Sequence, residues 1–130
     1  MEEIKYNVLI VDDDKFLLDM YALKFNNLGH HAVAVFGPNE ALEKLRNGES
    51  PDALILDIIM PVMDGLELLE IIRKENLAPQ STVIMLTNET DPAKIEKAKS
   101  LGSAGYIVKA TMIPSEVVSE VIRILKENKK

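Results

Sequence analysis

The sequence predicts an α/β fold in which helices cover both faces of one five-stranded parallel sheet. Strand and helix patterns alternate from one end of the chain to the other, and this alternation is typical of parallel sheets. Most strand segments are apolar along their whole length, which indicates strands buried on both faces. A length of 130 residues suits one domain. We therefore expect residues 1–130 to form a single domain with no second domain attached.

The first half of the chain contains two strand–helix units, which we expect at residues 6–12, 15–29, 30–37 and 38–48. The first segment is a continuous apolar run with β-branched residues, which indicates a buried strand. The helix after it has apolar residues at helical spacing and stops at Gly29. The second strand is weaker and is expected at an edge of the sheet. The short helix that follows opens with Pro38 and closes with Gly48.

The second half contains three more units, which we expect at residues 52–57, 64–76, 81–87, 91–102, 104–108 and 114–128. The third and fourth strands are continuous apolar runs, and the fifth is shorter. The fourth helix has three boundary signals, because Asp91 can cap its start, Pro92 suits its first position and Gly102 follows its end. The chain thus predicts five strand–helix units without a linker or a repeat.

Composition narrows the class of protein. The chain has no cysteine, which excludes a disulfide scaffold and thiolate metal sites. Its first residues are acidic and lead into no long apolar segment, so we expect neither a signal peptide nor a membrane span and place the protein in the cytoplasm. The net charge of -6 repels phosphate backbones, so we expect no direct contact with nucleic acid.

Chemically capable side chains follow four of the predicted strands. Asp12 and Asp13 end the first strand, Asp57 the third, Thr87 the fourth and Lys109 the fifth. In a parallel sheet of this kind, ligands bind beyond the carboxyl ends of the strands, and these ends share one rim. We therefore expect the acids, the hydroxyl and the ammonium group to converge.

Such a group suits a phosphoryl ligand. Two carboxylates about 4 Å apart repel by roughly 4 kcal/mol at an effective dielectric constant near 20, and a cation relieves this repulsion. Mg²⁺ prefers hard oxygen ligands such as carboxylates. A metal ion, the ammonium of Lys109 and the hydroxyl of Thr87 can together neutralise phosphoryl oxygens, and a central carboxylate can act as the nucleophile.

Three further polar residues have simpler interpretations. Asp14 lies where a helix N-cap is expected. His30 and His31 lie between the first helix and the second strand, at the opposite end of the sheet, and we expect both to be surface residues.

Four segments resemble the receiver domain of two-component response regulators. They are "VLIVDDD" (8–14), "LILDIIMPVMDGLELL" (54–69), "VIMLT" (83–87) and "GYIVKA" (105–110). The resemblance covers about residues 5 to 127 and is strongest to the single-domain type represented by the chemotaxis regulator. It implies a flavodoxin-like, doubly wound (βα)5 fold with the sheet order 2-1-3-4-5.

The resemblance also implies roles for the acids. Asp57 corresponds to the phosphoacceptor. Asp13 and Asp57 would bind Mg²⁺ directly, together with the backbone carbonyl of Ile59. Asp12 would act on the metal mainly through water.

The remaining roles concern the other strand ends. The resemblance implies that Thr87 binds a phosphoryl oxygen and shifts toward it on activation, and that Lys109 pairs with the phosphoryl group. Tyr106 corresponds to the rotating aromatic switch residue. Gly65 would allow the loop after the acceptor to turn.

The sequence departs from the family pattern at three positions. Ala110 replaces the usual proline after the lysine, Asn88 replaces a small residue, and Pro114 comes about one residue late. In the family the peptide bond between this lysine and the following proline is commonly cis, whereas a cis bond before alanine costs roughly 3–4 kcal/mol. We therefore expect the bond before Ala110 to be trans, with Met112 and Ile113 displayed on a reshaped loop.

The first helix has two apolar stripes. The stripe expected to face the sheet consists of Leu17, Leu18, Tyr21, Phe25 and Leu28. The second consists of Phe16, Met20 and Leu23. Two interpretations of it remain open: it packs against the last helix, or it is an exposed docking patch for a kinase, as this region is in the family.

The function that the resemblance implies is that of a stand-alone receiver. Asp57 would accept a phosphoryl group from a sensor histidine kinase or a histidine phosphotransfer protein, and the fourth helix, fifth strand and fifth helix would change conformation. We expect a monomer or weak dimer that signals through a downstream protein. It would catalyse only its own phosphorylation and dephosphorylation, and so is not an enzyme in the usual sense.

Two alternatives remain. A phosphohydrolase of the haloacid-dehalogenase type also places acids after its first strand, and Asp12 to Asp14 superficially match its motif. However, Phe16 stands where that motif has threonine or valine, and the chain is short for a cap domain. A degenerate receiver that acts by protein binding alone is the other alternative, and the complete set of acids, threonine and lysine argues against it.

Overall fold

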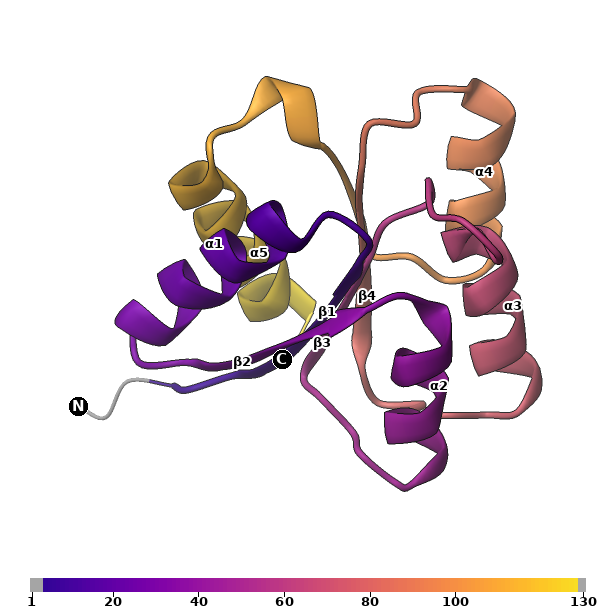
Figure 1. The fold of residues 1–130 in the computed structure, drawn as a ribbon, viewed down its shortest axis with the longest axis horizontal. Coiled ribbons are helices and arrows are strands. Elements are labelled where there is room, and N and C mark those ends of the chain that lie inside the picture. The colour runs from indigo at the N-terminus through magenta and orange to yellow at the C-terminus, as the bar shows by residue number, and fades with distance from the viewer. Residues whose placement is uncertain (1–3, 129–130) are drawn as a thin grey trace.

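The computed structural model describes residues 4–128, which form five strand–helix units (Figure 1). The elements are, in order, β1 (Asn7–Asp12), α1 (Lys15–Asn27), β2 (His31–Phe36), α2 (Pro38–Arg46), β3 (Ala53–Leu56), α3 (Gly65–Lys74), β4 (Thr82–Thr87), α4 (Pro92–Ser100), β5 (Gly105–Val108), the short 3-10 helix η1 (Lys109–Thr111) and α5 (Pro114–Asn128). Every predicted strand and helix is present, with ends that differ by a few residues.

The five strands form one parallel sheet in the order β2-β1-β3-β4-β5. This confirms the predicted fold class, the order implied by the resemblance and the edge position of β2. The chain leaves β1 toward one edge of the sheet and then returns past it to β3. The carboxyl ends of β1 and β3 therefore lie side by side, which is where ligands bind in sheets of this type.

Alternate strand residues supply two separate hydrophobic clusters, because successive side chains of a strand point to opposite faces. On β1, Val8 and Ile10 join the cluster beneath α1 and α5, whereas Leu9 and Val11 join the cluster beneath α2, α3 and α4. Figure 1 shows this division, with α1 and α5 on one side of the sheet and the other three helices on the opposite side. Burial on both faces explains the continuous apolar runs in the sequence.

Aspartates cap the starts of three helices. The Asp14 carboxylate accepts the Leu17 N–H at the start of α1, which confirms the predicted N-cap. Asp64 does the same for α3, and Asp91 for α4.

The sheet-facing stripe of α1 is confirmed except at its end. Leu18, Tyr21 and Phe25 are buried, and Leu17 is partly buried against the same cluster. The prediction was wrong for Leu28, whose side chain is 58% exposed. Leu28 is the residue after the last helical turn, so it no longer follows the helical spacing that the stripe assumes.

The two histidines differ. His31 is exposed, as expected. The prediction was wrong for His30, which is half-buried and accepts the Tyr6 N–H through Nδ1 at 3.0 Å. Its ring also lies against those of Tyr6 and Phe25. Between residues 4 and 128, no helix combines the length and the apolar character that crossing a membrane requires.

Candidate functional site: an acidic cluster around a buried lysine

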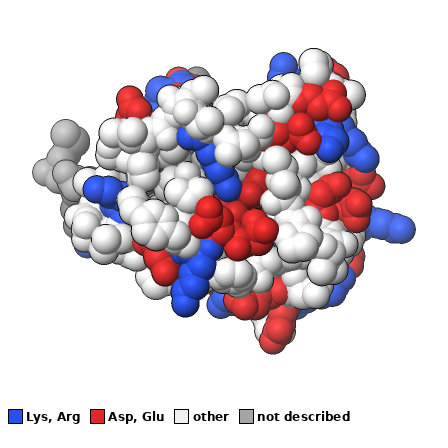
Figure 2. All heavy atoms as spheres, turned by 45° about the horizontal axis from the view of Figure 1, so that its top comes forward, with Lys and Arg blue, Asp and Glu red and all other residues white. Residues whose placement is uncertain are grey.

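Three carboxylates meet at the carboxyl ends of β1 and β3. One oxygen of each of Asp12, Asp13 and Asp57 lies within 4.8 Å of the other two. Asp12 and Asp57 are buried, with 1% and 4% of their surface exposed, whereas Asp13 is open to solvent. Figure 2 views this rim of the sheet from outside and shows acidic side chains gathered near its centre with basic side chains beside them. The convergence expected from the strand ends is therefore present.

Lys109 lies between the two buried acids. Its Nζ is 2.6 Å from Asp12 Oδ2 and 2.9 Å from Asp57 Oδ2, and only 9% of its side chain is exposed. Lys109 follows β5 at the far edge of the sheet, and its long side chain spans the carboxyl end of β4 to reach both acids. One ammonium group thus holds one oxygen of each carboxylate.

Backbone N–H groups hold the other oxygens. Asp12 Oδ1 accepts the N–H groups of Asp13 and Asp14, at 2.8 and 3.1 Å. Asp57 Oδ1 accepts the N–H of Ile59 at 3.1 Å. Both buried carboxylates therefore have fixed orientations, as buried charges need partners to offset their loss of water.

The site has an excess of negative charge. Burial raises the pKa of the Asp12 carboxyl from 3.8 to about 6, and the Asp57 charge adds to this effect, although hydrogen bonds from Lys109 and the Asp14 N–H oppose it. For Lys109, burial acts to lower the pKa, but its bonds to Asp12 and Asp57 outweigh burial and raise it. With all groups ionised, three carboxylates and one ammonium sum to a charge of -2. This charge and the hard oxygen donors suit a divalent cation.

Thr87 and Tyr106 each form a hydrogen bond with the backbone of Glu89. Thr87 ends β4 with no exposed surface, and its Oγ1 accepts the N–H of Glu89 at 3.2 Å. The Tyr106 hydroxyl, from β5, donates to the carbonyl of Glu89 at 2.6 Å. The Tyr106 ring is half-buried against the cluster beneath α2, α3 and α4. Glu89 therefore links the end of β4 to the Tyr106 side chain of β5, a link that no sequence signal indicated.

Gly65 is required for a different reason than expected. Its φ is not positive, and in the loop after Asp57 it is Val62 that adopts the left-handed conformation, with φ 73°. A Cβ on Gly65 would lie 2.1 Å from the Asp57 carbonyl oxygen. The glycine thus allows the start of α3 to approach the backbone of Asp57 closely.

The peptide bond between Lys109 and Ala110 is trans, as predicted, because no peptide bond in the described part of the chain is cis. Residues 109–111 form η1, and the Ala110 N–H donates to Asn88 Oδ1 at 2.8 Å. Ile113 is 61% exposed, as expected for a displayed residue. Met112 instead is half-buried and packs against the cluster beneath α1 and α5.

The second stripe of α1 does not pack against α5. Phe16 and Leu23 are 71% and 58% exposed, and Met20 is partly exposed. The helices α1 and α5 instead share the buried cluster that contains Leu18 and Tyr21. The packing interpretation is therefore wrong for Phe16 and Leu23, and the docking interpretation stays open.

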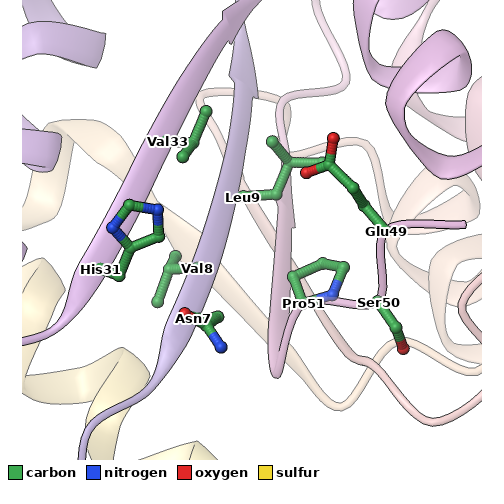
Figure 3. Close-up of a pocket in the computed structure, with 8 residues that line it drawn as sticks. All are labelled: Asn7, Val8, Leu9, His31, Val33, Glu49, Ser50 and Pro51. Atoms are coloured by element: carbon green, nitrogen blue, oxygen red, sulfur yellow. The ribbon is translucent and has the colours of Figure 1, made fainter. Parts of the chain in front are cut away.

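Two hollows lie near the sheet ends. One of about 210 Å³ lies at the amino ends of β1 and β2, away from the acids, and is lined by residues such as His31, Glu49 and Pro51 (Figure 3). The other, of about 310 Å³, lies beside Asp13 and includes Phe36 and Val62 among its lining residues. Only the second adjoins the acidic cluster.

The sequence matches the response regulator receiver domain family over residues 8–121. Among curated proteins, it is 34% identical over 128 residues to the "Probable transcriptional regulator ycf27" of Guillardia theta, covering 98% of this chain and 48% of that protein. It is 27% identical over 128 residues to the "DNA-binding response regulator MtrA" of Mycolicibacterium smegmatis, covering 98% and 54%. The chain thus spans about half the length of these relatives.

Solved structures resemble this one over nearly the whole chain. A CheY-like response regulator receiver domain protein from Methanospirillum hungatei JF-1 superposes with a TM-score of 0.85 at 27% identity, over 97% of this chain and 98% of that one. The chemotaxis protein CheY4 of Vibrio cholerae superposes with a TM-score of 0.82 at 29% identity, over 93% and 99%.

Proposed function

This chain belongs to the response regulator receiver family, and on that premise we propose that it accepts a phosphoryl group on Asp57 from a histidine kinase or a histidine phosphotransfer protein. The observation that carries the proposal is the placement of Asp57, a buried carboxylate 2.9 Å from the ammonium of Lys109 at the centre of an acidic cluster. The alternative of a haloacid-dehalogenase type phosphohydrolase loses its support, because the family match assigns the chain elsewhere.

The proposed reaction is a transfer between two side chains. A carboxylate oxygen of Asp57 attacks the phosphorus of a phosphohistidine, the P–N bond breaks, and its electron pair leaves with the imidazole. The product is an acyl phosphate on Asp57, and attack of water on its phosphorus releases inorganic phosphate. The chain would thus catalyse only its own phosphorylation and dephosphorylation.

Mg²⁺ fits the donors of the site. Asp12, Asp13 and Asp57 are close enough together to hold one ion, and the backbone carbonyl of Ile59 would add a fourth oxygen. When bound, the ion neutralises phosphoryl oxygens during transfer. Lys109 supplies a second positive charge, from a side chain already oriented by Asp12 and Asp57.

Thr87 and Tyr106 are the proposed switch. The Thr87 hydroxyl would donate to a phosphoryl oxygen, and its bond with the Glu89 N–H would adjust as it moves. Tyr106 holds the carbonyl of the same residue, so movement of Glu89 would be passed to the surface formed by α4, β5 and α5. A downstream protein would bind the altered surface.

The partner that donates the phosphoryl group would dock beside the site. Phe16 and Leu23 on α1 and Ile113 before α5 are large apolar side chains left exposed. The relatives of about twice the length are named as transcriptional or DNA-binding regulators, but we propose no nucleic-acid contact for this chain, whose net charge is -6.

The test is incubation with Mg²⁺ and a small phosphodonor, followed by intact mass measurement. The wild type should gain the mass of one phosphoryl group, and Asp57→Asn should gain none. The control is Asp91→Asn at the exposed N-cap of α4, which should be phosphorylated like the wild type. A phosphoryl group on Asp57→Asn would contradict the assignment of the acceptor.

A further inference from the structure

Two residues that depart from the family pattern contact each other. The Ala110 N–H donates to Asn88 Oδ1 at 2.8 Å. A proline at position 110 has no N–H and could not form this bond. A small side chain at position 88, such as alanine, would have no oxygen to accept it. The bond therefore needs an N–H at position 110 and an acceptor side chain at position 88, and the two departures supply them.

The bond joins the two loops that carry the chemical groups. Asn88 directly follows Thr87, which is fully buried at the end of β4. Ala110 directly follows Lys109, which is held by its ion pairs with Asp12 and Asp57. Each partner of the bond is thus one residue beyond an anchored side chain.

Other bonds of the turn are local. The Thr111 hydroxyl donates to the Val108 carbonyl at 2.8 Å, and the Met112 N–H donates to the Lys109 carbonyl at 3.4 Å. These bonds shape η1 but do not connect it to the loop after β4. The Asn88 side chain makes that connection across the ends of the two neighbouring strands.

A simpler interpretation is that Asn88 only satisfies an amide at the surface, since both residues are exposed. Water could replace such a bond without consequence. However, the bond links the residues that directly follow two anchored side chains, Thr87 and Lys109, so a displacement of one loop is transmitted to the other as long as the bond holds. The two interpretations predict different responses to a ligand at the acidic cluster.

We propose that Asn88 is a positioning residue that couples the Thr87 loop to the Lys109 loop, so that both move as a unit when a phosphoryl group binds. The inference rests on the proposed function and extends it. Through η1, the coupling carries the response of the site to Ile113, which is exposed next to α5.

The experiment follows backbone amide resonances of the full chain by NMR, before and after adding Mg²⁺ with beryllium fluoride as a stable phosphoryl mimic. In the wild type, shifts at Ile59 report loading of the site, and shifts at Ala110 and Ile113 report the response of the second loop. In Asn88→Ala we expect the same shift at Ile59 and less than half the wild-type shifts at Ala110 and Ile113.

Two further variants test whether a weaker response in Asn88→Ala comes from the lost acceptor oxygen. Asn88→Asp keeps an acceptor oxygen at the same position and should restore more than half of the response at Ala110 and Ile113. Asn47→Ala alters an exposed asparagine after α2 and should respond like the wild type.

The outcomes distinguish this inference from the proposed function. A wild type without a shift at Ile59 contradicts the proposed function and the inference together. A full response of Ala110 in Asn88→Ala, with Ile59 shifted, overturns the inference alone. A response of Asn88→Asp as small as that of Asn88→Ala overturns it as well, because the acceptor oxygen would then be irrelevant.

Discussion

At the scale of single residues, burial and charge act against each other in Asp12. The carboxylate is 1% exposed, and removal from water raises its pKa more than Lys109 lowers it. Asp57 opposes ionisation of the same group through its own charge. The metal-free site is therefore electrostatically strained at neutral pH, which is a common property of functional sites.

This strain predicts a pH dependence of stability in the metal-free protein. Between pH 3.8 and about 6, folded Asp12 holds a proton that the unfolded chain has released. The stability contributed by this group is thus complete below about pH 4 and is lost as the pH rises through 6, by about 3 kcal/mol in total. Urea denaturation in a chelator at several pH values measures it.

Asp12→Asn is the comparison for this prediction. The variant removes the titrating group and leaves one neutral oxygen for the Asp13 and Asp14 N–H groups. The difference in free energy of unfolding between variant and wild type should grow in favour of the variant from pH 4 to pH 7. A difference that stays constant over this range contradicts the prediction.

Gly65 gives a second prediction at this scale. In Gly65→Ala the new Cβ would lie 2.1 Å from the Asp57 carbonyl oxygen and 3.0 Å from Ile58 Cα, so the backbone must shift. We expect a loss of about 1–3 kcal/mol in the free energy of unfolding, as in other overpacked sites. The yield of phosphorylated protein should also fall, because Asp57 moves. Stability equal to that of the wild type would show that the loop relaxes freely.

At the scale of elements, η1 contains Ala110, one of the three departures from the family pattern. The hydrogen bond from this turn to Asn88 depends on residue 110 having an N–H, and η1 depends on Lys109 adopting a helical backbone conformation, which is disfavoured before proline. The bond with Asn88 thus excludes proline at position 110.

Ala110→Pro should therefore destabilise the protein, by about 1–2 kcal/mol from the lost hydrogen bond and the rearranged turn. Ala110→Gly keeps the N–H and is the matched control, with a smaller loss. Chemical denaturation of the two variants provides the measurement. A proline variant more stable than the wild type would mean that the turn accepts the family geometry.

The exposed stripe of α1 predicts a loss of partner recognition without loss of stability. In the double variant Phe16→Ser and Leu23→Ser, stability should change by less than about 0.5 kcal/mol, because both side chains are at the surface. Phosphotransfer from the cognate kinase should slow by about tenfold or more if the stripe contains binding hot spots.

The control for this prediction is Leu28→Ser, because Leu28 is as exposed as Leu23 but lies after the end of α1. The rate of phosphorylation by a small phosphodonor should be equal in the wild type, the double variant and Leu28→Ser. If the kinase also phosphorylates the double variant as fast as the wild type, the exposed stripe of α1 is not the docking surface.

At the scale of the whole molecule, the topology gathers the charged groups at one rim. Chain segments 45 residues apart, at Asp12 and Asp57, become neighbours because β1 pairs with β3. The same rim carries Lys109, so that a charge of -2 remains for a ligand of opposite sign when all groups are ionised.

Mg²⁺ should therefore stabilise the folded chain by mass action. At a free concentration one hundred times the dissociation constant, the free energy of unfolding should rise by about 2.7 kcal/mol. Asp13→Asn removes a solvent-exposed proposed ligand, so it should weaken Mg²⁺ binding while leaving metal-free stability equal or slightly raised. Denaturation at increasing Mg²⁺ concentration tests this, and an unchanged affinity in the variant contradicts the metal assignment.

The sequence by itself determined the alternation of strands and helices and the positions of the polar residues that follow the strands. Continuous apolar runs and capping residues are local signals, so they could be interpreted without knowledge of distant contacts. The carboxyl ends of parallel strands share a rim, and this rule alone predicted that Asp12, Asp57 and Lys109 would meet. The order of the strands came from family resemblance rather than from any pattern in the residues.

Only the tertiary structure decided which side chains are buried and which partners they find. Helical spacing alone could not show that Phe16 is exposed or that His30 packs against Tyr6, because burial depends on elements that arrive from elsewhere in the chain. The hydrogen bond between Asn88 and Ala110 is another feature that local sequence signals could not predict. It joins two residues 22 positions apart, and its formation depends on the pairing of β4 with β5.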